Sequence, residues 1–371
     1  MSIPTFYTPK TPSTTGSGVT PTTTSSSLAA SQPQKEAVIG TNDDAASCKL
    51  SAVNIGYYND KYVHYFVKKP IRRPPLINRG FFSRVETIEQ LTQQFFSIYS
   101  GCPTVQIVNL GCGYDTFYFR LKSRGLVKNV TYFEVDYDKV VTNKIKIIRS
   151  SRELMDLIVE EGQDPSLVVQ DTRIMSKDYR LTSIDLTASR DVIDNVFQSL
   201  NIDYNAPTMF ISECVIVYIP TECGNTLIKW AADRFAEAAF ITYEQIKPYD
   251  EFGAMMIKNI ENKGCPLLSI TSFPEIKDQR NRYLSLGWKR VDVLDMLNIY
   301  NQFITKERRK ETEVLEIFDE FEEWNMIQGH YCFVLAIKSV DQSKTVQYHF
   351  EQQQPMPTLA SGTNTVSSTT S

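Results

Sequence analysis

Short apolar runs alternate with helical patterns through most of this chain. The clearest helical pattern lies at 84–99, where one face carries Val85, Ile88, Leu91, Phe95 and Ile98. Continuous apolar runs are typical of buried parallel strands, and they occur at 104–110, 130–135, 167–169, 207–212, 239–243, 288–293 and 330–337. Strands that alternate with helices in this way predict an α/β domain. We expect a mostly parallel, seven-stranded sheet with helices on both faces.

The two ends of the chain lack this pattern. Residues 1–47 are rich in Ser, Thr and Pro, and residues 341–371 are rich in Gln, Ser and Thr. Such segments cannot bury enough apolar area to fold. We therefore expect disordered tails at 1–47 and 341–371 around one folded domain at 48–340, in which 246–325 is mostly helical.

Two glycines follow the first predicted strand, and the second predicted strand ends on an acid. Gly111 and Gly113 let the backbone approach a ligand closely, because glycine has no Cβ. Asp136 lies 25 positions after Gly111, near the roughly 20 expected for an acid that binds ribose hydroxyls in a doubly wound sheet. An incidental glycine turn would explain the loop alone, but not the acid at the tip of the next strand. The pattern predicts a nucleoside cofactor.

The same loop is poorly suited to phosphates. The third glycine of a dinucleotide fingerprint is absent, and Asp115 lies where the following helix should begin. A carboxylate there would repel a phosphate and would instead cap backbone N–H groups. S-adenosylmethionine, which has no phosphate, fits this loop. Because ligands bind at the carboxyl ends of parallel strands, we expect one site to be formed by Gly111, Asp136, Asp171 and Glu213.

Composition narrows the setting. The 371 residues carry a net charge of -4 without a block of like charge, so nucleic-acid binding is not expected. No apolar run reaches about 18 residues, which argues against a membrane span. Seven scattered cysteines without a C-x-x-C pair favour a reduced cytoplasmic, or also nuclear, setting. The three histidines do not suggest a metal site. We expect a monomer.

Five motifs make the chain resemble the leucine carboxyl methyltransferase family. They are NRGFFSRV at 78–85, QIVNLGCG at 106–113, YFEVD at 132–136, SECV at 212–215 with Tyr218, and YEQ at 243–245. The resemblance covers about 48–338 and implies a Rossmann-like fold that uses S-adenosylmethionine. It implies methylation of the C-terminal leucine carboxylate of the protein phosphatase 2A catalytic subunit, forming an ester that regulates phosphatase assembly. Cys112 stands where the family shows alanine, a small change that the loop should tolerate.

The resemblance also assigns cofactor-binding residues. Lys49 and Arg84 would meet the methionine part, with Glu213 beside the methionine or its amino group. Gly111 would pass close to the cofactor and Asp136 would bind the ribose. The adenine would be lined by Asp185 and Leu186.

The acceptor side follows from residue chemistry. A terminal carboxylate has a pKa near 3.3 to 3.7, so it is ionised at pH 7 and needs no base. A guanidinium can hold it bidentately. The candidates are Arg79, Arg173 and Arg84, of which Arg84 is better assigned to the cofactor. Tyr218 and Tyr243 would donate phenolic hydrogen bonds, although aromatic packing explains them equally well. The helices of 246–325 would build the acceptor pocket, with a leucine side chain against Met255, Met256, Ile257 and Ile260, or these four are plain core.

Two other enzyme readings and one binding reading stay open. The fold also suits a small-molecule O-methyltransferase, and a family relative acts in making the wybutosine base of transfer RNA. That relative carries a C-terminal β-propeller, whereas no repeat of 40 to 50 residues occurs here. We therefore favour the phosphatase-methylating branch. A binding module without catalysis is disfavoured, because the expected cofactor residues are intact.

Overall fold

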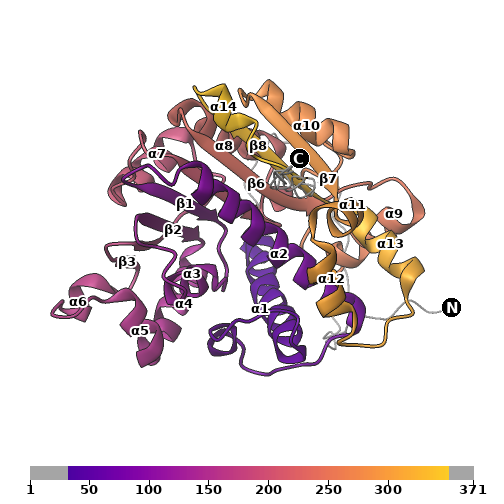
Figure 1. The fold of residues 1–371 in the computed structure, drawn as a ribbon, viewed down its shortest axis with the longest axis horizontal. Helices are drawn as coiled ribbons and strands as arrows, with labels where there is room; N and C mark the ends of the chain where they lie inside the picture. Colours follow the sequence, from indigo (N-terminus) through magenta and orange to yellow (C-terminus); the bar gives the residue numbers. More distant parts are fainter. Residues whose placement is uncertain (1–31, 351–371) are drawn as a thin grey trace, which may run out of the picture.

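A mostly parallel sheet runs through the middle of the protein (Figure 1). The computed structural model describes residues 32–350. The sheet has eight strands in the order β3-β4-β2-β1-β5-β6-β8-β7, of which β3 and β8 run antiparallel to their neighbours. Their bounds are β1 Val105–Leu110, β2 Val130–Asp136, β3 Arg173–Met175, β4 Tyr179–Ser183, β5 Thr208–Glu213, β6 Ala238–Gln245, β7 Arg290–Asp295 and β8 Tyr331–Lys338.

The predicted α/β class is confirmed, but the strand count is wrong by one. The run at 167–169 is not a strand, because Pro165 begins a short helix, α6 (Pro165–Val168), and the Asp164 side chain caps it. The chain then makes a short hairpin of β3 and β4. The parallel strand next to β2 is β4, whose apolar residues only alternate along the sequence YRLTS.

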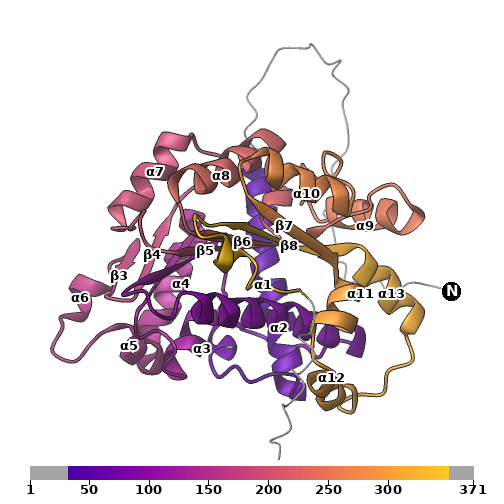
Figure 2. The ribbon, with the colours of Figure 1, turned by 45° about the horizontal axis from the view of Figure 1, so that its top comes forward.

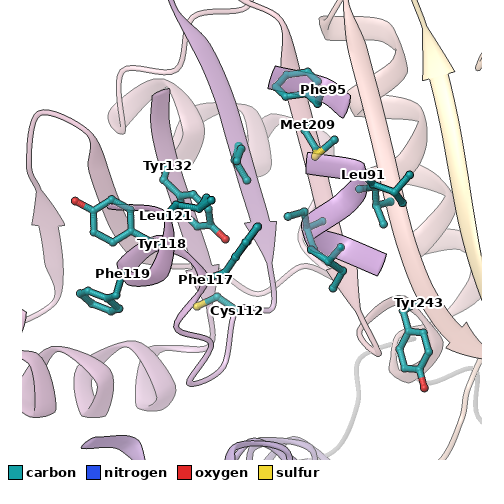
Figure 3. Packing of buried hydrophobic residues seen from close by; sticks show 14 of the residues in the cluster. Leu91, Phe95, Cys112, Phe117, Tyr118, Phe119, Leu121, Tyr132, Met209 and Tyr243 are labelled. Carbon is teal, nitrogen blue, oxygen red and sulfur yellow. The ribbon is translucent and has the colours of Figure 1, made fainter. Parts of the chain in front are cut away.

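Helices cover both faces of the sheet (Figures 1 and 2). On one face, strand residues such as Met209 pack with α2 (Pro75–Ile98), α3 (Phe117–Ser123), α4 (Asp138–Ser150) and α5 (Arg152–Ile158). Figure 3 shows Met209 of β5 beside Leu91 and Phe95 of α2. On the other face, residues such as Phe210 pack with α7 (Arg190–Ser199), α8 (Thr221–Arg234) and α10 (Ile276–Ser285). The neighbours Met209 and Phe210 point to opposite faces, as strand geometry requires.

Further helices gather beside β7 and β8 at one end of the sheet (Figures 1 and 2). They are α9 (Glu251–Glu261), α11 (Met296–Asn298), α12 (Lys306–Glu313) and α13 (Phe321–Gly329). This matches the expected helical content of 246–325. The short helical segment η3 (Ile299–Phe303) follows α11 here, whereas η1 (Val63–Phe66) lies against α1 and α4. Within residues 32–350, no helix is both long and apolar enough to cross a membrane.

Both expected tail boundaries are wrong. The helix α1 spans Gln32–Ile55, and its residues from Ala46 to Ala52 are buried. The Ser/Thr/Pro-rich composition, averaged over 1–47, concealed where the helix begins. At the other end α14 (Gln342–Thr345) follows β8, and Phe350 is buried against Phe303, with ring centroids 5.5 Å apart. The rest of the two expected tails, 1–31 and 351–371, lies outside the described residues.

Candidate active site

The carboxyl ends of the parallel strands β4, β2, β1, β5 and β6 lie at one edge of the sheet. Leu110, the last residue of β1, is level with Val135 of β2 and Ser212 of β5. Gly111, Asp136 and Glu213 therefore lie together, as the sequence predicted. The strand order reverses between β1 and β5, and such a reversal is where α/β sheets bind ligands.

Asp171 does not belong to this edge. It follows the helix α6 instead of a strand, its side chain is 88% exposed, and it pairs with Arg149. Its expected place is taken by Asp185, which lies two residues after β4. The error follows directly from reading 167–169 as the third parallel strand.

The glycine loop leaves no space for side chains. Gly111 has φ 63° and Gly113 has φ 50°, a region that favours glycine. A Cβ on Gly111 would lie 2.6 Å from the Val215 side chain, and one on Gly113 would lie 2.4 Å from Oδ1 of Asn42. The second contact shows that α1 lies directly over the loop. The packing of Val215 and Asn42 against the loop therefore requires glycine at both positions.

Asp136 is built to accept hydrogen bonds. The Gly113 N–H donates to Oδ2 and the Tyr137 N–H donates to Oδ1, both at 2.7 Å. Burial raises the pKa of Asp136 to about 6, although these two backbone donors and Lys144 oppose the rise. A carboxylate has about four lone-pair sites. Two of them remain for further donors such as the hydroxyls of a ribose.

Four charged groups alternate in sign beside the loop. Arg84 Nε, from α2, pairs with Oε1 of Glu213. Lys49 Nζ, from α1, lies 3.2 Å from Oε2 of Glu213 and 2.9 Å from Oδ1 of Asp115. We call Lys49, Arg84, Asp115 and Glu213 the charge cluster. It offers partners of both signs, which is what the ammonium and carboxylate of one amino acid require.

The pKa shifts in the charge cluster favour ionised groups. Burial alone would lower the pKa of Lys49, but Asp115 and Glu213 outweigh it and raise the pKa above its ordinary value. Burial would also raise the pKa of Asp115, yet Lys49 and Lys144 hold it at about 2. Asp115 accepts one backbone hydrogen bond, from the Phe117 N–H at 3.3 Å, but the N-cap residue of α3 is Thr116 and not Asp115.

The predicted adenine residues have different surroundings. Oδ2 of Asp185 lies 2.5 Å from Nζ of Lys35, a residue of α1, and Oδ1 accepts hydrogen bonds from Thr187. Leu186 is buried in the apolar cluster that packs under α7 and α8. Their contact with an adenine stays a prediction.

The two tyrosines predicted for the acceptor side lie near the charge cluster. The Tyr243 ring centroid is 4.6 Å from Cζ of Arg84, and the ring stacks on Tyr331 with centroids 5.3 Å apart. Tyr218 ends the short turn η2 (Ile216–Tyr218), which follows Glu213. Burial raises the pKa of the Tyr218 and Tyr243 hydroxyls, so both are neutral hydrogen-bond donors at pH 7.

An apolar cluster continues from these tyrosines. Its buried members are Val217, Met256, Leu267 and Ile270, and partly buried around them are Tyr218, Phe252, Ile257, Ile260 and Tyr331. Three of the four residues predicted to contact a leucine side chain belong to it. Met255 does not, because its side chain points outward and is 44% exposed.

The other two arginines have different environments. Arg79 lies five residues before Arg84 on α2, so it faces about 140° away from it around the helix. Its guanidinium lies 3.7 Å from the ring centroid of Phe318. Arg173 lies on the edge strand β3, which β4, β2 and β1 separate from β5. The sequence offered no sign of either placement.

A cavity of about 960 Å³ opens elsewhere, between α2, α3 and α12. Its lining includes Tyr58, Glu86, Gln90, Arg120 and Arg308. None of the predicted site residues lines it, so we assign the chemistry to the strand edge, where the charges and the glycine loop converge.

These features define an α/β methyltransferase domain, and comparison with known proteins specifies the family. The model of a family described as "Leucine carboxyl methyltransferase" matches residues 29–232. The chain is 40% identical to a leucine carboxyl methyltransferase 1 homolog of Arabidopsis thaliana, over 84% of this chain and 92% of that protein. The chain belongs to the leucine carboxyl methyltransferase family, as its motifs predicted.

Two further matches are more distant. The human tRNA wybutosine-synthesizing protein 4 is 33% identical, over 88% of this chain and 47% of that protein. A solved geranyl diphosphate methyltransferase matches with a TM-score of 0.44 and 13% identity, covering 83% of this chain and 99% of that one.

Proposed function

We propose that this protein transfers a methyl group from S-adenosylmethionine to the α-carboxylate of the C-terminal leucine of the protein phosphatase 2A catalytic subunit. The observation that carries the proposal is the charge cluster at the strand edge, beside Tyr243 and the apolar cluster around Met256. Membership of the leucine carboxyl methyltransferase family supports the choice of acceptor.

The residues at the edge fit the cofactor. Asp136 has acceptor capacity for ribose hydroxyls, and the charge cluster offers partners of both signs to an amino-acid group. Gly111 and Gly113 keep the loop backbone close-packed at the same place, because a Cβ at either position would collide with Val215 or Asn42. When bound, S-adenosylmethionine supplies an electrophilic methyl group on its sulfonium. The residues that would hold it are Lys49, Arg84, Gly111, Asp136, Asp185 and Glu213.

The acceptor needs orientation more than activation. A terminal carboxylate is ionised at pH 7, so no side chain must remove a proton. Drying the carboxylate has a cost that hydrogen-bond donors must offset. Tyr218 and Tyr243 are neutral phenols near the charge cluster, and both can donate a hydrogen bond to the acceptor carboxylate. Proper positioning of two reactants can lower a barrier by up to roughly 7 to 11 kcal/mol.

The apolar cluster is the proposed site of the leucine side chain. Met256, Ile257 and Ile260 come from α9, and Tyr331 connects them to Tyr243 by ring stacking. Burying a leucine side chain is worth about 1.5 to 3 kcal/mol. The apolar cluster would therefore select an apolar terminal residue. The tyrosines would bind the acceptor carboxylate, and the charge cluster would bind the amino-acid part of the cofactor.

Methyl transfer from labelled S-adenosylmethionine tests this proposal. The acceptor would be the phosphatase catalytic subunit in three forms: with its terminal leucine, without it, and with an amidated C-terminus. Only the first should be labelled, because the amide offers no anionic oxygen and truncation removes the apolar side chain. Labelling of all three would disprove the terminal carboxylate as acceptor.

The same assay addresses the main alternative. Similarity to the human tRNA wybutosine-synthesizing protein favours a second candidate, a carboxyl methyltransferase that acts on a modified nucleoside. Transfer to hypomodified transfer RNA, with none to the phosphatase, would support that candidate. Transfer to neither would favour a small-molecule acceptor.

A further inference from the structure

One lysine interrupts the apolar face of α4. The neighbours Val140, Val141, Ile145 and Ile148 are buried at helical spacing, and Lys144 lies among them with a side chain 0% exposed. Its Nζ is 2.6 Å from Oε2 of Glu134, whose side chain is 1% exposed on β2. This is a fully buried ion pair. Apolar residues would be expected at both positions, because Lys144 lies on the apolar face of α4 and Glu134 lies within the apolar run of β2.

The pair connects to the glycine loop through a third contact. Lys144 Nζ also donates to the backbone carbonyl of Asp115 at 2.8 Å. Asp115 in turn holds Lys49 through its side chain, and Lys49 contacts Glu213. A continuous series of polar contacts therefore runs from the buried pair to the charge cluster.

Stability alone does not explain the pair. Replacing a buried ion pair by apolar residues of similar volume is often neutral or stabilising, because desolvating two charges is costly. Here the desolvation is incompletely compensated: Oε1 of Glu134 has no hydrogen-bond partner within residues 32–350. What apolar residues cannot replace is the hydrogen bond that Lys144 donates to the Asp115 carbonyl.

The Glu134 side chain has a second support that fixes its orientation. The Tyr179 hydroxyl, from β4, donates to the same Oε2 atom that Lys144 contacts. Glu134 is thus held from two sides, and it holds Lys144 under the loop. The same strand, β2, also carries Asp136 two residues later. One strand therefore orients both the acid predicted to bind ribose and the glutamate that holds Lys144 under the loop.

We infer that Lys144 and Glu134 are a positioning pair for cofactor binding, acting through the Asp115 carbonyl on Lys49 and the charge cluster. Both side chains are buried, with exposed fractions of 0% and 1%, so they act from beneath the loop. The inference rests on the proposed function, because it takes S-adenosylmethionine as the ligand. It assigns the pair to cofactor affinity and not to the methyl-transfer step.

Two double variants of equal net charge test the inference. Glu134→Leu with Lys144→Met removes both charges and the donor to Asp115. Glu134→Gln with Lys144→Gln also removes both charges but keeps an N–H donor at position 144. We call the first variant the apolar pair and the second the amide pair. The apolar pair should raise the Kd of S-adenosylmethionine roughly tenfold or more, because it loses the hydrogen bond from position 144 to the Asp115 carbonyl. The amide pair should stay within about threefold of the wild type.

Calorimetry of cofactor binding and thermal melting are measured on the same preparations. The KM for the cofactor should rise in the apolar pair, with kcat at saturating cofactor nearly unchanged. The control is Arg152→Met with Asp156→Leu, an exposed pair on α5 that should change neither quantity. Equal cofactor affinity in the apolar and amide pairs, with both folded, would overturn the inference.

If the apolar pair does not fold, Glu134→Gln with Lys144→Met decides, because it differs from the amide pair only in lacking the N–H donor to the Asp115 carbonyl. It should bind S-adenosylmethionine roughly tenfold more weakly than the amide pair. Equal affinity in these two variants would contradict a route through the Asp115 carbonyl. Absence of cofactor binding by the wild type would instead refute the proposed function, so the two failures are distinguishable.

Discussion

The Arg84 side chain pairs with Glu213 through its Nε, although the two residues come from different layers of the fold. Arg84 lies on α2 and Glu213 ends β5, 129 positions later. One Nη of Arg84 also approaches the Glu213 carbonyl at 3.5 Å. A guanidinium has five N–H donors. Glu213 therefore orients the planar fork and leaves donors for another anion.

Arg84→Lys should weaken cofactor binding even though it keeps the charge. Lysine cannot reproduce the planar fork, and hydrogen bonds to charged groups are worth roughly 1.5 to 3 kcal/mol, or about tenfold to a hundredfold in Kd. Calorimetry with S-adenosylmethionine measures the effect, and Arg124→Lys, at an arginine that is 46% exposed, is the control. If cofactor affinity holds and only the acceptor KM rises, Arg84 binds the acceptor terminus.

Asp136 should make cofactor binding depend on pH. Ribose hydroxyls donate to the ionised carboxylate, whereas protonation adds a donor and removes acceptor capacity. Because the pKa of Asp136 in the protein is about 6, affinity should be steady above pH 7 and should fall as pH drops through 6. Titration calorimetry from pH 5 to 8 checks this. Asp136→Asn should bind more weakly and show no such change; a wild-type Kd that is flat over this range would refute the ribose role.

The acids at strand ends show how far the sequence could lead. Asp136 and Glu213 end continuous apolar runs, so their position at the sheet edge was predictable. Asp171 misled because a three-residue apolar run, 167–169, forms part of a helix that Pro165 begins and Asp164 caps. Short apolar runs do not distinguish strand from helix. The true third parallel strand, β4, contains polar residues on alternate positions and gave no comparable signal.

Contacts between distant segments were not predictable from the pattern. α1 has no apolar stripe in its first half, so nothing indicated that Lys35 and Asn42 lie over the strand edge. Arg79 and Arg84 share a conspicuous motif, yet only the register of α2 decides which one meets Glu213. Lys144 is the one signal in the sequence that pointed to such a contact: a charged residue lies between Val141 and Ile145 on an apolar helical face.

Two N-terminal deletions should show what the first half of α1 contributes to cofactor binding. Deleting 1–31 should leave cofactor affinity unchanged, since that composition cannot form a core. Deleting 1–45 also removes Lys35, which pairs with Asp185, and Asn42, which covers Gly113. We expect cofactor dissociation to accelerate several-fold in the longer deletion. Melting temperature should change little, because the removed ion pairs are partly exposed and such pairs contribute about 0 to 1 kcal/mol.

Stopped-flow measurement of cofactor release compares the two truncations with the full chain. Lys35→Ala in the full chain is the matched point variant, and Lys258→Ala, on α9, is a control outside this contact. Equal release rates in both truncations would show that α1 does not cover the bound cofactor.

Glu244, next to Tyr243 on β6, should make stability depend on pH. Its side chain is buried, and Oε1 accepts the Val217 N–H at 2.9 Å, under the turn that carries Tyr218. Burial raises the pKa of Glu244 to about 7 from an ordinary 4.5, although Arg282 and the backbone donors oppose the rise. The folded state therefore binds this proton more tightly than the unfolded state does.

The sign of the effect follows from linkage. Where the folded state holds a proton that the unfolded state releases, stability falls as pH rises. For Glu244 this window lies between about pH 4.5 and 7, and the contribution is at most about 3 kcal/mol. Glu244→Gln keeps an acceptor for Val217 and cannot titrate. Wild type should therefore lose several degrees of melting temperature relative to Glu244→Gln between pH 4.5 and 7, and the difference should be constant above pH 8. Parallel melting curves for the two proteins across the whole range would show that Glu244 does not titrate in this window.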